Sequence, residues 1–322
     1  MKVLRFVGIA LAAFILGALG IYGWASYTAS RKLSRVYMAH AADFPIPFPT
    51  TEQEAGSRAR GGGAAGRQAR NEALERGKYL IQSRYGCGEC HGSNFGGGTM
   101  VDNPAIGRIL GPNLTGGKGS VTAGYSAADW DHIVRHGLKR AGTPSLMPSQ
   151  DFRRMSDQEL SDIVVFIQSR PPVDSQVPPP TLGPVGKVLL ATGKLPLSAD
   201  LIDSHEQPHP RLPPRSGLTI EFGRHVAATC MGCHRDDLGG GPIIGGDPSW
   251  PPAANLTPGP QGLGEWTFAQ FATAMREGKR PDGTALRAPM TNVVPYAQRM
   301  TQTELQALWS YLRSVPAVAA RK

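Results

Sequence analysis

The sequence contains few aromatic and few charged residues. Aromatic side chains make up 7% of its 322 residues, and charged side chains make up 18%. So little charge excludes a solvated, disordered polyelectrolyte, and 40% hydrophobic residues are too few for a polytopic membrane protein. Since large side chains are scarce, we expect something else to help fill the cores. The length predicts two globular domains.

Acidic residues are also scarce relative to basic ones, and the net charge is +9. Part of the basic excess lies in a Gly/Ala-rich run at 56–70, a composition typical of a flexible linker. This part of the charge therefore belongs to a solvated linker rather than to a nucleic-acid-binding surface. We expect no nucleic-acid partner, and instead a basic surface that faces anionic lipid or an acidic protein.

No charge interrupts the chain over residues 6–25, which follow Lys2 and Arg5. Twenty mostly apolar residues suit a membrane-spanning helix, whereas the core of a signal peptide is usually shorter. No clear A-x-A cleavage site follows. We predict an uncleaved single-pass anchor in a bacterial inner membrane, with a removed signal peptide as the alternative. Positive residues lie on both sides of the run, so their distribution does not orient it.

The chain has only four cysteines, and they form two C-x-x-C-H motifs. Such motifs are typical of c-type haem attachment, because two thiols one helical turn apart can each bond one vinyl group of a porphyrin. The next residue places its imidazole below the iron. The predicted residues for two haem c groups are Cys87, Cys90 and His91, and Cys230, Cys233 and His234.

Three other interpretations of the cysteines are weaker. A zinc site made of four cysteines needs no histidine beside either pair. A C-x-x-C disulfide closes a tight loop that is usually redox-active, and a thioredoxin-like pair would need a βαβ context that is absent. Covalent haem attachment requires an extracytoplasmic compartment, so we expect both motifs in the periplasm.

An internal repeat relates the two halves of the chain. Asn113 lies 26 residues after Cys87 and Asn255 lies 25 after Cys230, each within an Asn-Leu-Thr triplet. A methionine lies 60 residues after the first cysteine of each motif. The predicted organisation is an anchor at 1–27, a flexible tether at 28–71, a first haem domain at 72–172, a Pro-rich connector at 173–216, a second haem domain at 217–316 and a tail at 317–322.

Helical signals recur in both halves. Each last helix begins with a capping box, Ser156 with Glu159 and Thr301 with Glu304, followed by apolar residues at helical spacing. Residues 72–84 and 218–229 supply a helix before each motif. No strong run of alternating β-branched residues occurs. The predicted fold class is therefore mainly α: a transmembrane helix followed by two tandem helical domains centred on haem.

Methionine sulfur is a common sixth ligand of electron-transfer haem. Met147 and Met290 match each other in the repeat and lie in Pro-rich loops, so we predict them as distal ligands. Met155 and Met300 instead precede the capping residues, where a hydrophobic staple to Leu160 and Leu305 explains them. The other candidates are unmatched or badly placed: Met100, Met231 and Met275.

Histidines and loop residues complete the candidates. His136 is the main rival of Met147, but it aligns with Glu277, which indicates a surface or helix-end role. We predict that the Pro112 carbonyl accepts a hydrogen bond from His91, and that Asn113 and Asn255 support the haem ligands from behind. The repeat leaves the acceptor for His234 open. The remaining histidines carry no signal that assigns a role: His132 and His225 in helices, and His40, His205 and His209 in linkers.

These motifs resemble bacterial class I c-type cytochromes, duplicated in one chain. The resemblance rests on Cys87–His91, Gly111-Pro-Asn-Leu114, Met147-Pro148 and their second-half counterparts. The haem units are similar to those of cytochrome subunits of periplasmic alcohol and gluconate dehydrogenases, which carry three haems where this chain has two. The resemblance implies an electron carrier attached to the inner membrane.

Three functions fit the motifs. The first is an electron relay, without catalytic residues, between a quinol-oxidising complex or dehydrogenase and a terminal acceptor. The second is the cytochrome c subunit of a multisubunit dehydrogenase. The third is a dihaem peroxidase, which would need an open iron. A methionine at the same spacing in both halves argues against an open iron.

Overall fold

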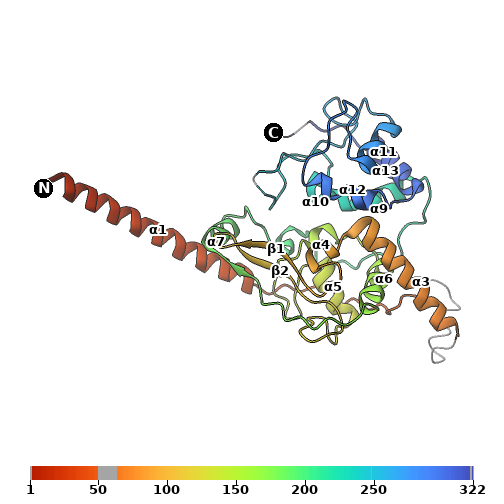
Figure 1. The fold of residues 1–322 in the computed structure, drawn as a ribbon, viewed down its shortest axis with the longest axis horizontal. Coiled ribbons are helices and arrows are strands. Elements are labelled where there is room, and N and C mark those ends of the chain that lie inside the picture. Colours follow the sequence, from red (N-terminus) through yellow and green to blue (C-terminus); the bar gives the residue numbers. More distant parts are fainter. Residues whose placement is uncertain (1, 50–63, 248, 320, 322) are drawn as a thin grey trace.

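The computed structural model describes residues 2–49, 64–247, 249–319 and 321, and they form a mostly helical molecule (Figure 1). Two domains lie side by side, and a long N-terminal helix extends from the end of the first one, beside α7 (Pro184–Ala191). The first domain contains α3 (Ala64–Leu80), a π-helical turn (Ile81–Tyr85), α4 (Gly88–His91), α5 (Ala127–Arg135) and α6 (Asp157–Gln168). The second contains α9 (Ile220–Ala227), α10 (Met231–His234), α11 (Phe268–Glu277), α12 (Val294–Ala297) and α13 (Gln302–Ser314).

Helix α1 spans Lys2–Ser34 and is long and apolar enough to cross a membrane. Its N-terminal apolar side chains are exposed. Its last turns pack against α7 (Pro184–Ala191) of the connector, where Ala29 shares an apolar cluster with Leu190. Lys32 Nζ also donates to the Leu190 carbonyl at 3.1 Å. The helix therefore continues past the predicted anchor and ends docked on folded protein.

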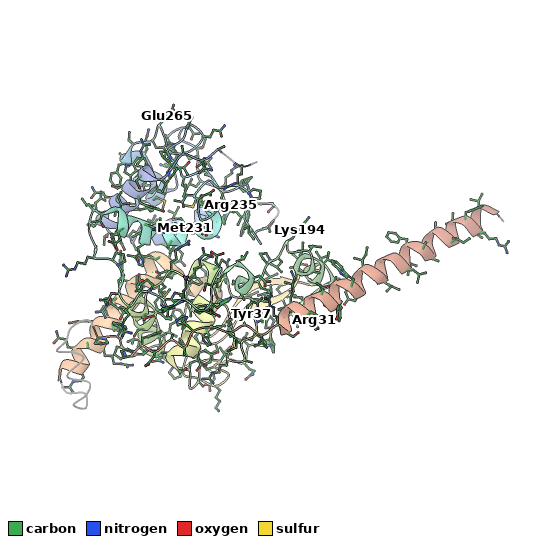
Figure 2. The ribbon with its side chains drawn as sticks, turned by 180° about the vertical axis from the view of Figure 1, so that it is seen from behind. Arg31, Tyr37, Lys194, Met231, Arg235 and Glu265 are labelled. Carbon is green, nitrogen blue, oxygen red and sulfur yellow. The ribbon has the colours of Figure 1, made fainter. Side chains whose placement is uncertain are left out.

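The segment predicted as a flexible tether is structured where it is described. Phe44 and Phe48 are 3% and 5% exposed and lie in the core of the first domain. The backbone N–H of Tyr37 donates to the Gly142 carbonyl at 2.9 Å, and Figure 2 shows Tyr37 against the same domain. Helix α3 also begins before the predicted boundary at residue 72. A domain with few aromatic residues thus completes its core with two phenylalanines from the preceding segment.

A small sheet accompanies the predicted helices. Strands β1 (Gly98–Asn103) and β2 (Gly107–Gly111) form an antiparallel hairpin, and β3 (Thr181–Leu182) of the connector pairs with β2. Most of β1 is exposed, and two of the three buried positions of β2 are glycines, so the sequence carries no run of alternating apolar side chains that would predict the strands. The connector also contributes α7 and α8 (Ser198–Leu201), and it packs on the first domain.

Each domain is built on a close crossing of its first and last helices. In the first domain, a Cβ on Gly77 would lie 2.0 Å from the carbonyl oxygen of Asp162. In the second, a Cβ on Gly223 would lie 2.1 Å from that of Ala307. The repeat thus preserves a crossing of α3 with α6, and of α9 with α13, that only glycine permits at these positions. The predicted capping boxes of α6 and α13 are both formed, which confirms the predicted starts of the last helices.

Candidate functional site

Both C-x-x-C-H motifs form a single helical turn. Cys87 immediately precedes α4 and Cys230 immediately precedes α10, so the first thiol of each motif lies one helical turn before the second thiol and the adjacent histidine. The four cysteines, all within the described residues, form no disulfide and are half-buried. Burial raises the pKa of the Cys230 and Cys233 thiols to about 11. The thiols are therefore protonated at neutral pH and spaced for addition to two vinyl groups of one porphyrin.

The two motif histidines are oriented by backbone carbonyls. His91 Nδ1 lies 2.9 Å from the Pro112 carbonyl oxygen, and His234 Nδ1 lies 2.7 Å from that of Ala254. Each carbonyl accepts the Nδ1 proton, which leaves the Nε2 lone pair available to an iron. Burial also lowers the pKa of both imidazoles and favours the neutral form that binds metal. These donors fit a covalently attached haem with an axial histidine.

The chain packs tightly behind the first motif. A Cβ on Gly111 would lie 2.0 Å from the carbonyl oxygen of Cys90. The glycine thus lets the end of β2 approach the motif and brings the Pro112 carbonyl to His91. In the second domain an alanine carbonyl fills this role, because the chain before Asn255 follows a similar path despite its different sequence.

The repeated asparagines are structural. Asn113 is fully buried, and its Nδ2 donates to the Val173 carbonyl at 2.7 Å. Asn255 Nδ2 donates to the Val318 carbonyl at the same distance. Each asparagine also accepts from the backbone N–H of the threonine two residues later. They therefore fasten the chain that leaves the last helix of each domain.

The predicted distal methionines lie in different local settings. Met290 begins a 3₁₀ turn and packs against the core that Cys230 also borders. Met147 lies in a loop where Ser198 Oγ donates to its carbonyl at 2.6 Å. Both side chains are half-buried. Met155 and Met300, by contrast, are buried with Leu160 and Leu305, as expected for staples. Iron ligation by Met147 and Met290 stays a prediction.

Comparison with known sequences identifies the two domains. The profile of the family described as Cytochrome c matches residues 74–171 and 220–316, which together make up more than half of the chain. The chain belongs to the cytochrome c family. Both helical domains are cytochrome c domains, and their cofactors are two haem c groups.

Three relatives show the range of known similarity. The cytochrome c subunit of the quinone-dependent alcohol dehydrogenase of Gluconacetobacter polyoxogenes is 26% identical over 76% of this chain and 56% of its own length. The fructose dehydrogenase cytochrome subunit of Gluconobacter japonicus is 25% identical over 78% and 54%. A diheme cytochrome c-type protein of Cereibacter sphaeroides is 24% identical over 72% and 83%. The chain therefore spans little more than half the length of the two dehydrogenase subunits.

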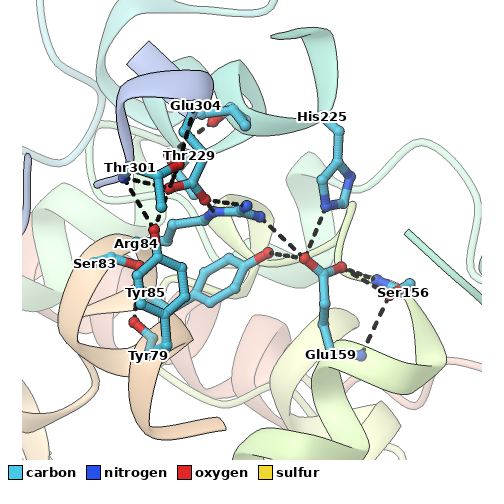
Figure 3. Close-up of polar contacts among 11 residues, drawn as sticks. Tyr79, Ser83, Arg84, Tyr85, Ser156, Glu159, His225, Thr229, Thr301 and Glu304 are labelled. Carbon is cyan, nitrogen blue, oxygen red and sulfur yellow. Dashed lines mark hydrogen bonds and ion pairs between the residues drawn. The ribbon is translucent and has the colours of Figure 1, made fainter. Parts of the chain in front are cut away.

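The two cytochrome c domains meet around one buried arginine, Arg84, whose side chain is 7% exposed (Figure 3). It donates to Glu159 Oε1 at 3.2 Å in its own domain. It also donates to Glu304 Oε1 across the interface, at 2.5 Å from Nη2 and 3.1 Å from Nε. Glu159 and Glu304 are the capping-box glutamates of α6 and α13. One guanidinium thus connects repeat-related positions of the two domains.

The two glutamates remain ionised in this buried setting. Burial alone would raise the pKa of Glu304, but the charge of Arg84 and hydrogen bonds from Tyr79 and Arg84 hold it below its usual value. Burial acts likewise on Glu159, where His225 and Arg84 lower the pKa. His225 Nε2 lies 2.8 Å from Glu159 Oε1. His225, predicted only as a helix residue, is therefore also an interdomain contact.

Each attachment motif also touches the opposite domain. The Tyr296 hydroxyl of the second domain donates to the carboxylate of Glu89, inside the first motif. Asp151 of the first domain packs on the second motif so closely that a Cβ on Gly232 would lie 2.0 Å from its Oδ1. Burial raises the pKa of Asp151 to about 6. Both haem-attachment turns therefore lie at the domain interface.

His136 differs from its predicted surface or helix-end role in one respect. It does follow the last residue of α5, but it is fully buried. The histidines assigned to linkers are the reason, because His40, His205 and His209 pack around it. No local sequence pattern indicated this, since the four residues come from three separate segments of the chain.

Proposed function

We propose that this protein relays electrons between a redox donor and a redox acceptor through two haem c groups held in one docked pair of domains. The observation that carries the proposal is the contact of each attachment motif with the opposite domain, Tyr296 with Glu89 and Asp151 with Gly232. Bound haem supplies an iron that cycles between ferrous and ferric states. The fold brings both attachment motifs to the same interface, where two such centres would be held.

The axial residues suit a carrier. The carbonyls of Pro112 and Ala254 fix the orientation of His91 and His234. Met147 and Met290, as the sixth ligands, would close both irons to small molecules. A closed iron exchanges electrons without binding substrate, which separates this proposal from a dihaem peroxidase.

We further propose that α1 spans a bacterial inner membrane once and holds both domains in the periplasm. The length and composition of α1 support the span. Covalent haem attachment by C-x-x-C-H motifs supports the periplasmic side. The docked C-terminal turns of α1 set the domains close to the membrane surface.

Assembly with a dehydrogenase is a second candidate function. It is favoured by relatives that are named cytochrome subunits of alcohol, fructose and gluconate dehydrogenases. In that arrangement the substrate site lies on another chain, and this chain receives electrons from it. Purification from native membranes in mild detergent distinguishes the two, because the subunit would copurify with a stoichiometric catalytic partner.

The central experiment uses the full chain from native membranes. We expect two covalent haems per chain by mass spectrometry, retention of both after acid extraction, and negligible binding of carbon monoxide by the reduced protein. An apo chain, a single haem, full carbon monoxide binding at one iron, or peroxide turnover at enzymatic rates would contradict the closed electron relay.

A further inference from the structure

Five of the six histidines outside the attachment motifs lie together at the C-terminal end of α5. They come from three separate parts of the chain. His132 and His136 belong to the end of α5, His40 to the segment before the first domain, and His205 and His209 to the connector. With the buried carboxylate of Asp131, they form a polar cluster on the first domain that the haem sites do not use.

Four of these groups direct ligand atoms to one point. Single ligand atoms of Asp131, His40, His136 and His209 all lie within 4.8 Å of one another. The Nε2 atoms of His136 and His209 are 3.1 Å apart, and Asp131 Oδ2 is 3.5 Å from the Nε2 atoms of both His40 and His136. A tetrahedral zinc ion with bonds of about 2.0–2.1 Å has ligand–ligand edges of about 3.3 Å. These three spacings are close to that edge length, and His209 Nε2 also lies 3.6 Å from the other carboxylate oxygen of Asp131, Oδ1.

The surrounding hydrogen bonds assign the imidazole tautomers. His205 Nε2 lies 3.1 Å from the Ala199 carbonyl and donates to it, so His205 Nδ1 accepts from His136 Nδ1 at 3.0 Å. The Nε2 lone pair of His136 therefore faces the cluster. His40 Nδ1 lies 3.4 Å from the His205 carbonyl, which directs the Nε2 lone pair of His40 to the same point. Such outer hydrogen bonds are typical of metal-binding histidines.

The carboxylate of Asp131 provides a second, independent observation, because one of its oxygens is buried without a hydrogen-bond donor among the described residues. Its side chain is fully buried, and Oδ1 accepts from Arg135 Nε at 2.5 Å. Oδ2 has no hydrogen-bond partner within the part of the chain that the structure describes. Arg135 also pairs with Asp157, so two carboxylates share one guanidinium. A carboxylate oxygen unpaired in the described chain, 3.5 Å from two imidazole Nε2 atoms and beside a guanidinium that two carboxylates share, suits a bound cation.

We propose that His40, His136, His209 and Asp131 form a structural zinc site. Three imidazole nitrogens and one carboxylate oxygen in tetrahedral spacing suit Zn²⁺, which is redox-inactive and prefers four ligands. The ion would fasten the segment before the first domain and the connector to α5.

The first test is the metal content of the full holoprotein, purified without added metal or chelator. Elemental analysis should give one zinc for every two irons. His209→Gln should lose at least nine-tenths of the zinc, whereas the matched control His225→Gln, at a histidine outside the cluster, should keep it. X-ray absorption spectroscopy at the zinc edge should show three nitrogen ligands and one oxygen ligand at about 2.0–2.1 Å from the zinc.

A second measurement covers the case in which the variant fails to fold. Chelation of zinc from the native holoprotein should lower the Tm by roughly 5–10 °C, and added Zn²⁺ should restore it. Chelation should also speed proteolysis of the connector near His209. Native protein that contains no zinc and takes up none from one added equivalent would overturn the proposal in favour of a protonated imidazole–carboxylate pair. Full zinc content in His209→Gln would overturn it as well.

Discussion

Replacement of Arg84 by methionine should uncouple the two cytochrome c domains. Methionine fills a similar volume without the charge, so Arg84→Met leaves the carboxylates of Glu159 and Glu304 buried without their shared cation. Breaking a buried ion pair on one side costs about 3–5 kcal/mol. Because Arg84 is 7% exposed and forms the link between repeat-related caps, we expect most of this cost to fall on domain docking.

Two measurements on the full chain check this expectation. Hydrogen exchange of amides at the start of α13 should accelerate on the order of 100-fold, since about 1.4 kcal/mol corresponds to each tenfold step. Electron exchange between the two haems should slow after rapid reduction of one of them. Arg76→Met is the control, because Arg76 lies on α3, which continues directly into the π-helical turn of Arg84, but bonds Asp162 within its own domain at 2.7 and 2.9 Å. Unchanged exchange in Arg84→Met, or equal effects in both variants, would refute the reasoning.

The same contact also predicts a pH dependence. The pKa of Glu304 and Glu159 is lower in the folded protein than the usual value of 4.5. Their contribution to stability is therefore complete above that value and is lost as the pH falls through the lower folded pKa. Domain docking, measured by the same amides, should weaken on acidification in the parent and depend less on pH in Arg84→Met.

Three further predictions concern single positions. Met147→Ala should lower one haem potential and open that iron to carbon monoxide, whereas Met155→Ala should cost about 2–5 kcal/mol of stability and leave the iron closed, as optical titrations can show. Gly77→Ala should destabilise the first domain by roughly 1–3 kcal/mol in thermal unfolding, because its Cβ meets a backbone carbonyl. Gly66→Ala on the same helix, with no atom within 4 Å, should be neutral or slightly stabilising. Asn113→Ala should lower the free energy of unfolding by about 1–3 kcal/mol while haem content is retained. An unchanged Tm would contradict the role of Asn113 in fastening the chain that leaves α6.

Local sequence patterns predicted much of the fold. The starts of α6 and α13 follow from Ser156 and Thr301 with a glutamate three residues later, because all the hydrogen bonds of a capping box form within four consecutive residues. The staples of Met155 and Met300 follow from the same pattern. The repeat then placed both asparagines in corresponding turns. In each case the stabilising contacts lie close together in the sequence or recur in its second copy.

The remaining features depend on contacts between distant segments. Phe44 and Phe48 looked like tether residues because nothing beside them predicts a partner, yet they pack on helices that begin much later in the chain. Arg84 is an ordinary helical arginine until the second domain supplies Glu304. The cluster around Asp131 draws single residues from three segments, so no spacing rule could reveal it.

The way in which α1 ends has a mechanical consequence. A helix of 33 residues is about 50 Å long, while a bilayer core is about 30 Å thick. With α1 across a membrane as proposed, its remaining turns act as a stiff post fixed to the first domain (Figure 1). The haems would then keep a constant height and tilt above the lipid, free only to spin about the membrane normal and to drift within the plane. A membrane-bound partner whose redox centre lies at the same height would meet the haems by diffusion within the membrane plane. A soluble carrier would have to approach from the aqueous side, where only one face of the domains is accessible.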